Sequence, residues 1–249
     1  MRIEAITFDV THTLLHCPRL GEIYSEVLGR HGIPVSPPDA LRLVKTVWQE
    51  LSCAADPGRD RFSSHPDGER GWWARFLERL CELLDAPPPS RFAAAELFHR
   101  FGRAESWEVY PEVPRVLAEL RGQGLRLAVI SNWDHRLPGL LAELGLAPSF
   151  EAVVYSSAVG VEKPDRRIFG RALELLQLAP AAVLHVGDGR LEDFEGAAAV
   201  GFAALHLVRQ ERGKVPASPG RGEILDLTAL PGIVAARASG TRVLNSRQL

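Results

Sequence analysis

Four polar segments of the chain carry carboxylate, hydroxyl and ammonium side chains of the kinds that handle phosphoryl groups. They hold Asp9 with Thr11 and Thr13, then Ser131 with Asn132, then Lys163 before Pro164, and finally Asp188 with Asp193. Carboxylate oxygens suit a hard cation such as Mg²⁺, whose sites are often completed by substrate phosphate. A serine hydroxyl, backbone N–H groups and a lysine suit the oxygens of a phosphoryl group. These residue types predict a Mg²⁺-dependent phosphoryl-transfer site.

Strands must bring these segments together, and apolar stretches bounded by turn residues indicate where the strands lie. We predict strands over Ile3–Phe8, Leu125–Ile130, Ala182–Val186 and Ala203–Val208, with a weaker one over Ala152–Ser156. Helical patterns lie between them, over Val113–Arg121, His135–Leu144, Arg166–Leu176 and Glu192–Val200. This alternation predicts an α/β fold with a doubly wound, mainly parallel, Rossmann-like sheet. Such sheets bind ligands outside the carboxyl ends of their strands, where the polar segments fall.

The strand pattern is missing between Leu15 and Trp107, where the hydrophobic spacing is helical. Helices are expected over Gly21–Arg30, around Leu41–Leu51, around Trp72–Leu84 and over Arg91–Phe101, with a loop over Asp56–Gly71. Trp72 lies on a helical stripe, so we expect Trp72 and Trp73 to pack in a core and not to form a wall facing the substrate. A segment of roughly ninety residues is typical of a small domain.

This pattern predicts three parts. Residues 1–14 and 108–238 form an α/β core, residues 15–107 form an inserted helical cap, and residues 239–249 form a flexible tail. A last helix over Glu223–Leu230, followed by Pro231 and Gly232, is expected to dock on the core.

Composition narrows the class of protein. The 249 residues are 46% hydrophobic, which excludes global disorder, and 29 basic against 31 acidic residues give a net charge of −2. This charge offers no electrostatic case for binding nucleic acid or an anionic membrane surface. Cys17, Cys53 and Cys81 form no CxxC pair, and Glu4 and Asp9 interrupt the first apolar stretch. We therefore expect reduced thiols, no disulfide framework, no membrane segment and a cytoplasmic location.

The order of the four motifs resembles the haloacid dehalogenase-like hydrolase superfamily. The resemblance covers residues 2–13 and 109–208, through Asp-x-x-x-Thr at Asp9, Ser-Asn at Ser131, Lys-Pro at Lys163 and Gly-Asp-x-x-x-x-Asp at Asp188. The helical insertion lies where this superfamily often carries a cap. The resemblance implies that Asp9 is a nucleophile that forms an aspartyl-phosphate. It also implies that Ser131 and the Asn132 backbone bind a phosphoryl oxygen, and that Lys163 neutralises the charge of the phosphate and of Asp9.

The same resemblance implies a Mg²⁺ site. Asp9, Asp188 and the backbone carbonyl of Thr11 would hold the ion, with Asp193 as a further ligand or as a residue that orients the others. Thr13 would fix the loop after the first strand by hydrogen bonding. The substrate would be a small phosphorylated metabolite, whose identity no motif in the insertion specifies.

Two residues depart from the pattern. Phosphatases of the superfamily usually carry an acid/base Asp where this chain has Thr11, and positioned proton transfer contributes ~10²–10⁴-fold to rate. Hydrolysis is therefore expected to be slow, although the resembling cation-pumping ATPases also carry Thr there and form a persistent aspartyl-phosphate. His12 replaces a customary glycine. It is either a substitute acid/base, with an ordinary pKa of about 6.5, or a loop side chain that points toward the cap.

Two alternative functions stay open. The chain could be a catalytically impaired relative that serves as a binding or sensing module, because Thr11 is not an acid. It could also be a metal-independent 2-haloacid dehalogenase, which uses the same nucleophilic Asp. Gly187-Asp188 counts against the dehalogenase, because those enzymes carry a different fourth motif. Gly187 and Gly189 lack the third glycine of a dinucleotide fingerprint, which excludes that kind of site.

Overall fold

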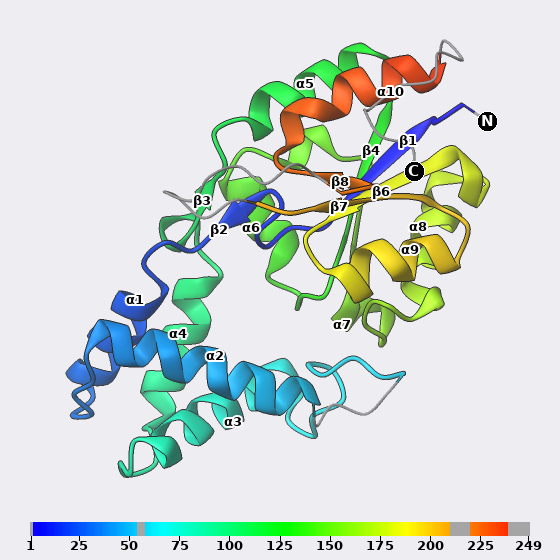
Figure 1. Ribbon diagram of the computed structural model, residues 1–249. Coiled ribbons are helices and arrows are strands. Elements are labelled where there is room, and N and C mark those ends of the chain that lie inside the picture. The colour runs from blue at the N-terminus through cyan, green and yellow to red at the C-terminus, as the bar shows by residue number, and fades with distance from the viewer. Residues whose placement is uncertain (1, 54–57, 210–219, 239–249) are drawn as a thin grey trace.

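The structure is a computed structural model that describes residues 2–53, 58–209 and 220–238 (Figure 1). Its main sheet has six strands in the order β5-β4-β1-β6-β7-β8, and every neighbouring pair is parallel. The strands are β1 (Ala5–Phe8), β4 (Arg126–Ser131), β5 (Ala152–Tyr155), β6 (Val183–Gly187), β7 (Ala203–Leu207) and β8 (Glu223–Ile224). The predicted doubly wound, Rossmann-like fold is confirmed, and the predicted tail lies outside the described residues.

Helices cover both faces of this sheet, which explains why its strands are apolar without alternation. One face packs against α5 (Val113–Gly122), α6 (Leu137–Glu143) and α10 (Leu230–Ala238), and the other against α8 (Arg166–Leu176) and α9 (Gly196–Ala199) (Figure 1). Along β1, Ile6 and Phe8 face the first layer and Ala5 faces the second. The short helix α7 (Ser156–Val159) follows β5, and a π-helical turn over Arg190–Glu195 precedes α9.

The last predicted helix was wrong. Glu223–Ile224 instead forms the edge strand β8, and α10 begins only at Leu230. Pro231, which we expected to end a helix, is the second residue of α10, where proline is tolerated because the first turn has no hydrogen bond for its missing N–H. The chain turns between β8 and α10. Asp226 favours this turn, since its side chain accepts a hydrogen bond from the Thr228 N–H at 2.8 Å.

Four helices form a separate unit between β1 and β4, here called the helical unit. They are α1 (Leu20–Arg30), α2 (Pro37–Cys53), α3 (Gly68–Leu83) and α4 (Arg91–Phe101), and they share their own hydrophobic cluster beside the sheet (Figure 1). The predicted loop ran four residues too far, because the polar first turn of α3, from Gly68 to Gly71, resembles a loop in composition. Trp72 is buried in this cluster, as expected.

The chain enters and leaves the helical unit through a two-stranded pair that the sequence did not reveal. Strand β2 (Leu15–His16) is antiparallel to β3 (Glu108–Val109). Among the described residues, no helix is long and apolar enough to cross a membrane.

Candidate active site

The carboxyl ends of three adjacent strands bring the predicted residues to one edge of the sheet. Asp9 directly follows β1, Ser131 ends β4 and Asp188 directly follows β6. Strand order reverses at β1, where β4 and β6 lie on its two sides, and such a switch point is where open α/β sheets bind ligands. The Asp9 N–H donates to the Val186 carbonyl at 2.9 Å, which fixes Asp9 beside β6.

Asp9 presents one occupied and one open carboxylate oxygen. Its Oδ1 accepts from Lys163 Nζ at 2.6 Å and from Ser131 Oγ at 3.0 Å. No described residue donates to Oδ2, and the side chain keeps 10% of its surface exposed. Burial raises the pKa of Asp9 more than the neighbouring Lys163 lowers it. Oδ2 is therefore the oxygen available to a cation or to an incoming electrophile.

Lys163 is the buried cation of the site. Besides Asp9, its Nζ donates to Asp193 Oδ1 at 2.6 Å and to the Ile130 carbonyl at 2.9 Å, which uses all three protons. Burial alone would lower the pKa of Lys163, but Asp193 and Asp9 together raise it above its usual value. Lys163 therefore stays charged at neutral pH.

The side chain of Asn132 holds the backbone of Lys163. Asn132 Oδ1 accepts from the Lys163 N–H at 2.7 Å, and Nδ2 donates to the Lys163 carbonyl at 3.1 Å. Sequence reasoning assigned only the backbone of Asn132 to the site. The structure adds this side-chain contact, which orients the lysine.

Two residues that the sequence analysis did not select support Asp193. His185 Nε2 lies 3.1 Å from Asp193 Oδ1, and His185 Nδ1 lies 2.8 Å from Thr7 Oγ1. Burial alone would raise the pKa of Asp193, but Lys163 and His185 outweigh it and hold that pKa below its usual range. The signal in the sequence was a histidine inside the apolar stretch Ala182–Val186.

The acidic residues at this edge fit a divalent cation. Ligand oxygens of Asp9, Asp188 and Asp193 all lie within 4.8 Å of one another. Burial first, and then Asp9 and Asp193, raise the pKa of Asp188 to about 7. Gly187 leaves the room that this packing needs, because a Cβ there would lie 2.3 Å from Asp193 Cγ. Three carboxylates here face one ammonium group, and a bound cation would offset their excess negative charge.

The backbone carbonyl of Thr11 is the fourth oxygen of the predicted ligand set. The His12 N–H donates to the Leu15 carbonyl at 2.7 Å, so the Thr11 carbonyl points the opposite way across the planar trans peptide. No described residue donates a hydrogen bond to that carbonyl. The predicted ligand set therefore fits Mg²⁺ in charge and in donor type.

Comparisons with known proteins agree with this geometry. A family model described as haloacid dehalogenase-like hydrolase matches residues 3–201. The chain belongs to the haloacid dehalogenase-like hydrolase family. It is 36% identical over 211 residues to human haloacid dehalogenase-like hydrolase domain-containing protein 3, covering 84% of this chain and 83% of that protein. It is 39% identical over 149 residues to the phosphoserine phosphatase of Thermus thermophilus, covering 58% of this chain and 57% of that enzyme.

Solved structures of the family share the fold. An HAD phosphatase from Thermococcus onnurineus matches with a TM-score of 0.62 and 25% identity, covering 98% of this chain and 100% of that chain. L-2-haloacid dehalogenase from Xanthobacter autotrophicus matches with a TM-score of 0.66 and 22% identity, covering 94% and 98%. The chain is thus a hydrolase of this family with phosphatases among its relatives. Its fold alone does not separate the two activities.

The loop after β1, residues 9–14 and here called the β1 loop, contains the two residues that depart from the family pattern, Thr11 and His12. The backbone of the loop explains the second departure. His12 has φ of 61°, the left-handed region that favours glycine, which accounts for the customary glycine at this position. The residue is exposed overall, but partial burial of its ring lowers the pKa of His12, so the imidazole is neutral at neutral pH.

Thr13 contributes to fixing this loop through its backbone and not through its side chain. Thr13 is completely buried, and its Oγ1 has no hydrogen-bond partner among the residues that the structure describes. The loop is fixed through the backbone instead, since the N–H groups of Thr13, Leu14 and Leu15 converge on the Val10 carbonyl at 3.2, 2.8 and 3.1 Å.

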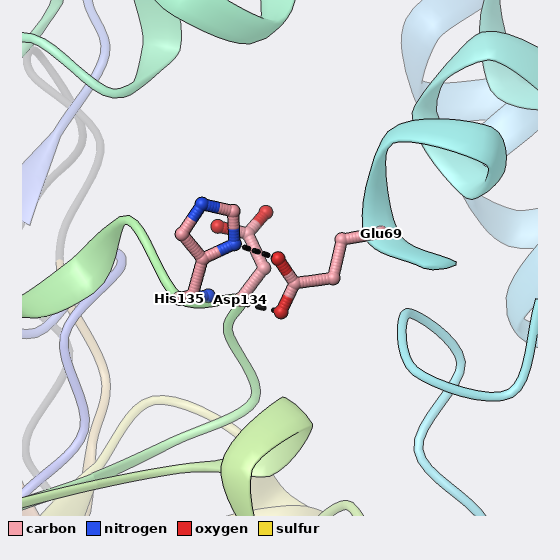
Figure 2. A group of neighbouring side chains, drawn as sticks. All are labelled: Glu69, Asp134 and His135. Carbon is pink, nitrogen blue, oxygen red and sulfur yellow. Dashed lines mark hydrogen bonds and ion pairs between the residues drawn. The ribbon is translucent and has the colours of Figure 1, made fainter. Parts of the chain in front are cut away.

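A second acidic group joins the helical unit to the core of this hydrolase. Glu69 reaches from α3 to the ring and the backbone N–H of His135, beside Asp134 (Figure 2). Asp134 is completely buried, and its two oxygens accept from Arg136 and from Trp73 Nε1 at 2.8 Å. These donors saturate the carboxylate, so we assign the group to packing between the helical unit and the α/β part of the chain, and not to a metal.

Replacing Asp134 with alanine is expected to lower the free energy of unfolding by about 3–5 kcal/mol. The substitution leaves the buried Arg136 without its carboxylate and Trp73 without an acceptor. Trp73→Phe removes only one donor and should cost about 1–3 kcal/mol. Urea denaturation measures both, and an Asp134→Ala protein as stable as wild type would contradict this assignment.

Proposed function

We propose that this chain hydrolyses a small phosphate monoester in a Mg²⁺-dependent reaction, through an aspartyl-phosphate on Asp9. The observation that carries the proposal is the arrangement around Asp9. Ser131 and Lys163 hold Oδ1 at 3.0 and 2.6 Å, and Oδ2 is left open in a cluster with Asp188. An open carboxylate oxygen beside an ammonium, a hydroxyl and a cation site suits nucleophilic attack on phosphorus.

The residues of this chain would act in two steps. First, an Asp9 oxygen bonds to phosphorus as the bond from phosphorus to the ester oxygen breaks, and Lys163 and Ser131 bind the phosphoryl oxygens. The departing oxygen then needs a proton, which the Thr11 hydroxyl cannot usefully supply. Second, water attacks the phosphorus and restores the Asp9 carboxylate, and Thr11 cannot take the proton from that water. Thr11 provides positioned proton transfer in neither step, so we expect slow turnover.

Mg²⁺ would be held by Asp9, Asp188 and the Thr11 carbonyl. It would supply positive charge that offsets the negative charge of the phosphoryl oxygens. Asp193 would orient the site, because its oxygens already accept from Lys163, His185 and the Gly189 N–H. Residues 15–107 would form a cap on a core of residues 1–14 and 108–238. This cap would exclude water and contact the leaving group.

A panel of phosphate monoesters with and without Mg²⁺ tests the proposal against the alternatives. We expect phosphate release that requires both Mg²⁺ and Asp9. Chloride release from 2-haloacids without metal would favour the dehalogenase instead. Metal-dependent phosphate binding without any turnover would favour the binding or sensing module.

Mg²⁺ affinity should depend on pH through Asp188. Because the pKa of Asp188 lies at about 7 in the metal-free protein, a proton must leave before the carboxylate can bind Mg²⁺. We expect affinity to fall by about tenfold per pH unit below neutrality and to level off above about pH 8. Isothermal titration with MgCl₂ measures this dependence. An affinity that does not change with pH would contradict the role of Asp188.

Asp188→Asn should remove Mg²⁺ binding and stabilise the metal-free protein at about pH 8. The raised pKa means that the folded state binds this proton more tightly than the unfolded chain does. The contribution of this bound proton to the free energy of unfolding is therefore lost as pH rises through about 7. An asparagine carries no charge to lose. Asp226→Asn, at an exposed helix cap that asparagine also fills, is the control and should change neither property.

A further inference from the structure

We propose that Arg209 is a positioning residue that holds the β1 loop in the conformation needed for cation binding. The proposal rests on the proposed function, because it concerns the Thr11 carbonyl as a Mg²⁺ ligand. Arg209 lies two residues beyond the end of β7, far along the chain from Asp9, and no sequence motif marks it.

The guanidinium of Arg209 binds two successive carbonyls of the β1 loop. Its Nε donates to the His12 carbonyl at 2.9 Å, and its Nη2 donates to the Thr13 carbonyl at 2.7 Å. The side chain is only 16% exposed, so these contacts are largely shielded from water. A planar fork with five donors can make both contacts at once, whereas a lysine ammonium is a single compact charge.

The first of these carbonyls belongs to the strained residue of the loop, and the second belongs to the residue after it. His12 has φ of 61°, a left-handed conformation that is unfavourable for a residue other than glycine. Such a conformation persists only where its surroundings hold it. Arg209 holds the His12 carbonyl on one side, and the Leu15 carbonyl holds the His12 N–H on the other at 2.7 Å. The second contact fixes the peptide plane that aims the Thr11 carbonyl.

Arg209 also connects the β1 loop to the segment that returns from the helical unit. Its Nη2 lies 2.7 Å from Glu112 Oε1, and its Cζ lies 3.4 Å from the centroid of the Tyr110 ring. Tyr110 is itself fixed to the loop, because its N–H donates to the Leu14 carbonyl at 3.0 Å. One largely buried guanidinium therefore joins the β1 loop to the linker between β3 and α5.

The test is Mg²⁺ binding by Arg209→Lys, measured by isothermal titration without substrate. We expect Mg²⁺ affinity to fall by about 10- to 100-fold, the range seen when residues that support a metal ligand are replaced. Arg126→Lys is the matched control. Arg126 also pairs with a glutamate, Glu151, and donates to a carbonyl, that of Leu176, but it does so at the amino end of β4. Its replacement should leave Mg²⁺ affinity unchanged.

A double-mutant cycle separates positioning from general stability. Glycine adopts the left-handed conformation without strain, so His12→Gly should remove most of the need for Arg209. We expect Arg209→Lys to cost less than about threefold in Mg²⁺ affinity in the His12→Gly background. Unchanged Mg²⁺ affinity in folded Arg209→Lys, or an equal loss in both backgrounds, would overturn the proposal. Wild-type protein that binds no Mg²⁺ would instead overturn the proposed function, and this inference with it.

Discussion

Asp9→Asn is expected to lower kcat/KM for the best phosphate ester by at least about 10⁴-fold, in line with the loss of a nucleophile in other hydrolases. An amide oxygen cannot form the aspartyl-phosphate. It can still accept from Lys163 and Ser131, so the fold should survive the change. Steady-state phosphate release in saturating Mg²⁺ measures the effect. Activity in Asp9→Asn close to that of wild type would remove Asp9 from the mechanism.

Asp165→Asn is the matched control for this substitution. Asp165 lies two residues after Lys163 and caps α8 by accepting from the Arg167 N–H at 2.8 Å, a role that asparagine fills equally well. It contacts none of the carboxylates at the strand ends. The activity of the Asp165→Asn protein should match that of wild type. This result would show that loss of a charge near Lys163 does not by itself stop turnover.

Thr11→Asp is expected to raise kcat by about 10²–10⁴-fold, the usual contribution of a positioned acid/base. Thr11 is only partly buried, so a carboxylate can enter without complete desolvation. The new carboxyl group would protonate the leaving oxygen and then take a proton from the attacking water. Phosphate release by wild-type and Thr11→Asp protein under the same conditions measures the gain.

Thr11→Asn supplies the comparison for that gain, because it has the shape of aspartate without its proton chemistry. We expect the asparagine variant to stay as slow as wild type. If wild type already turns over at rates typical of phosphatases and Thr11→Asp brings no increase, then Thr11 does not limit the reaction and another group performs the proton transfer.

The strands that carry the site could be predicted because burial on both faces gives each of them a continuous apolar stretch. Ile3–Phe8 and Ala182–Val186 contain β1 and most of β6 for this reason, and the polar residues after them mark the strand ends. Parallel pairing then brings Asp9, Ser131 and Asp188 together without any knowledge of the loops.

The contacts that tune the site could not be predicted, because they join residues far apart in the chain. His185 lies beneath Asp193 only because the turn after β6 folds back over the strand end. Arg209 reaches the His12 carbonyl only because β7 ends near the β1 loop. Local pattern also failed at Pro231, where the same residue type that ends many helices lies in the first turn of one.

A phosphoryl group bound to Asp9 is the intermediate that the proposed reaction requires. Wild-type protein and Mg²⁺ would be mixed with a phosphate ester that the protein hydrolyses. The mixture would be quenched in acid within one turnover, digested and analysed by mass spectrometry. Because Thr11 cannot take the proton from the water that attacks in the second step, we predict that phosphorylated enzyme is present within one turnover, with the group on the peptide that contains Asp9 and absent in Asp9→Asn. Turnover with no phosphoryl group on that peptide at any quench time, or with the group on another residue, would contradict the account.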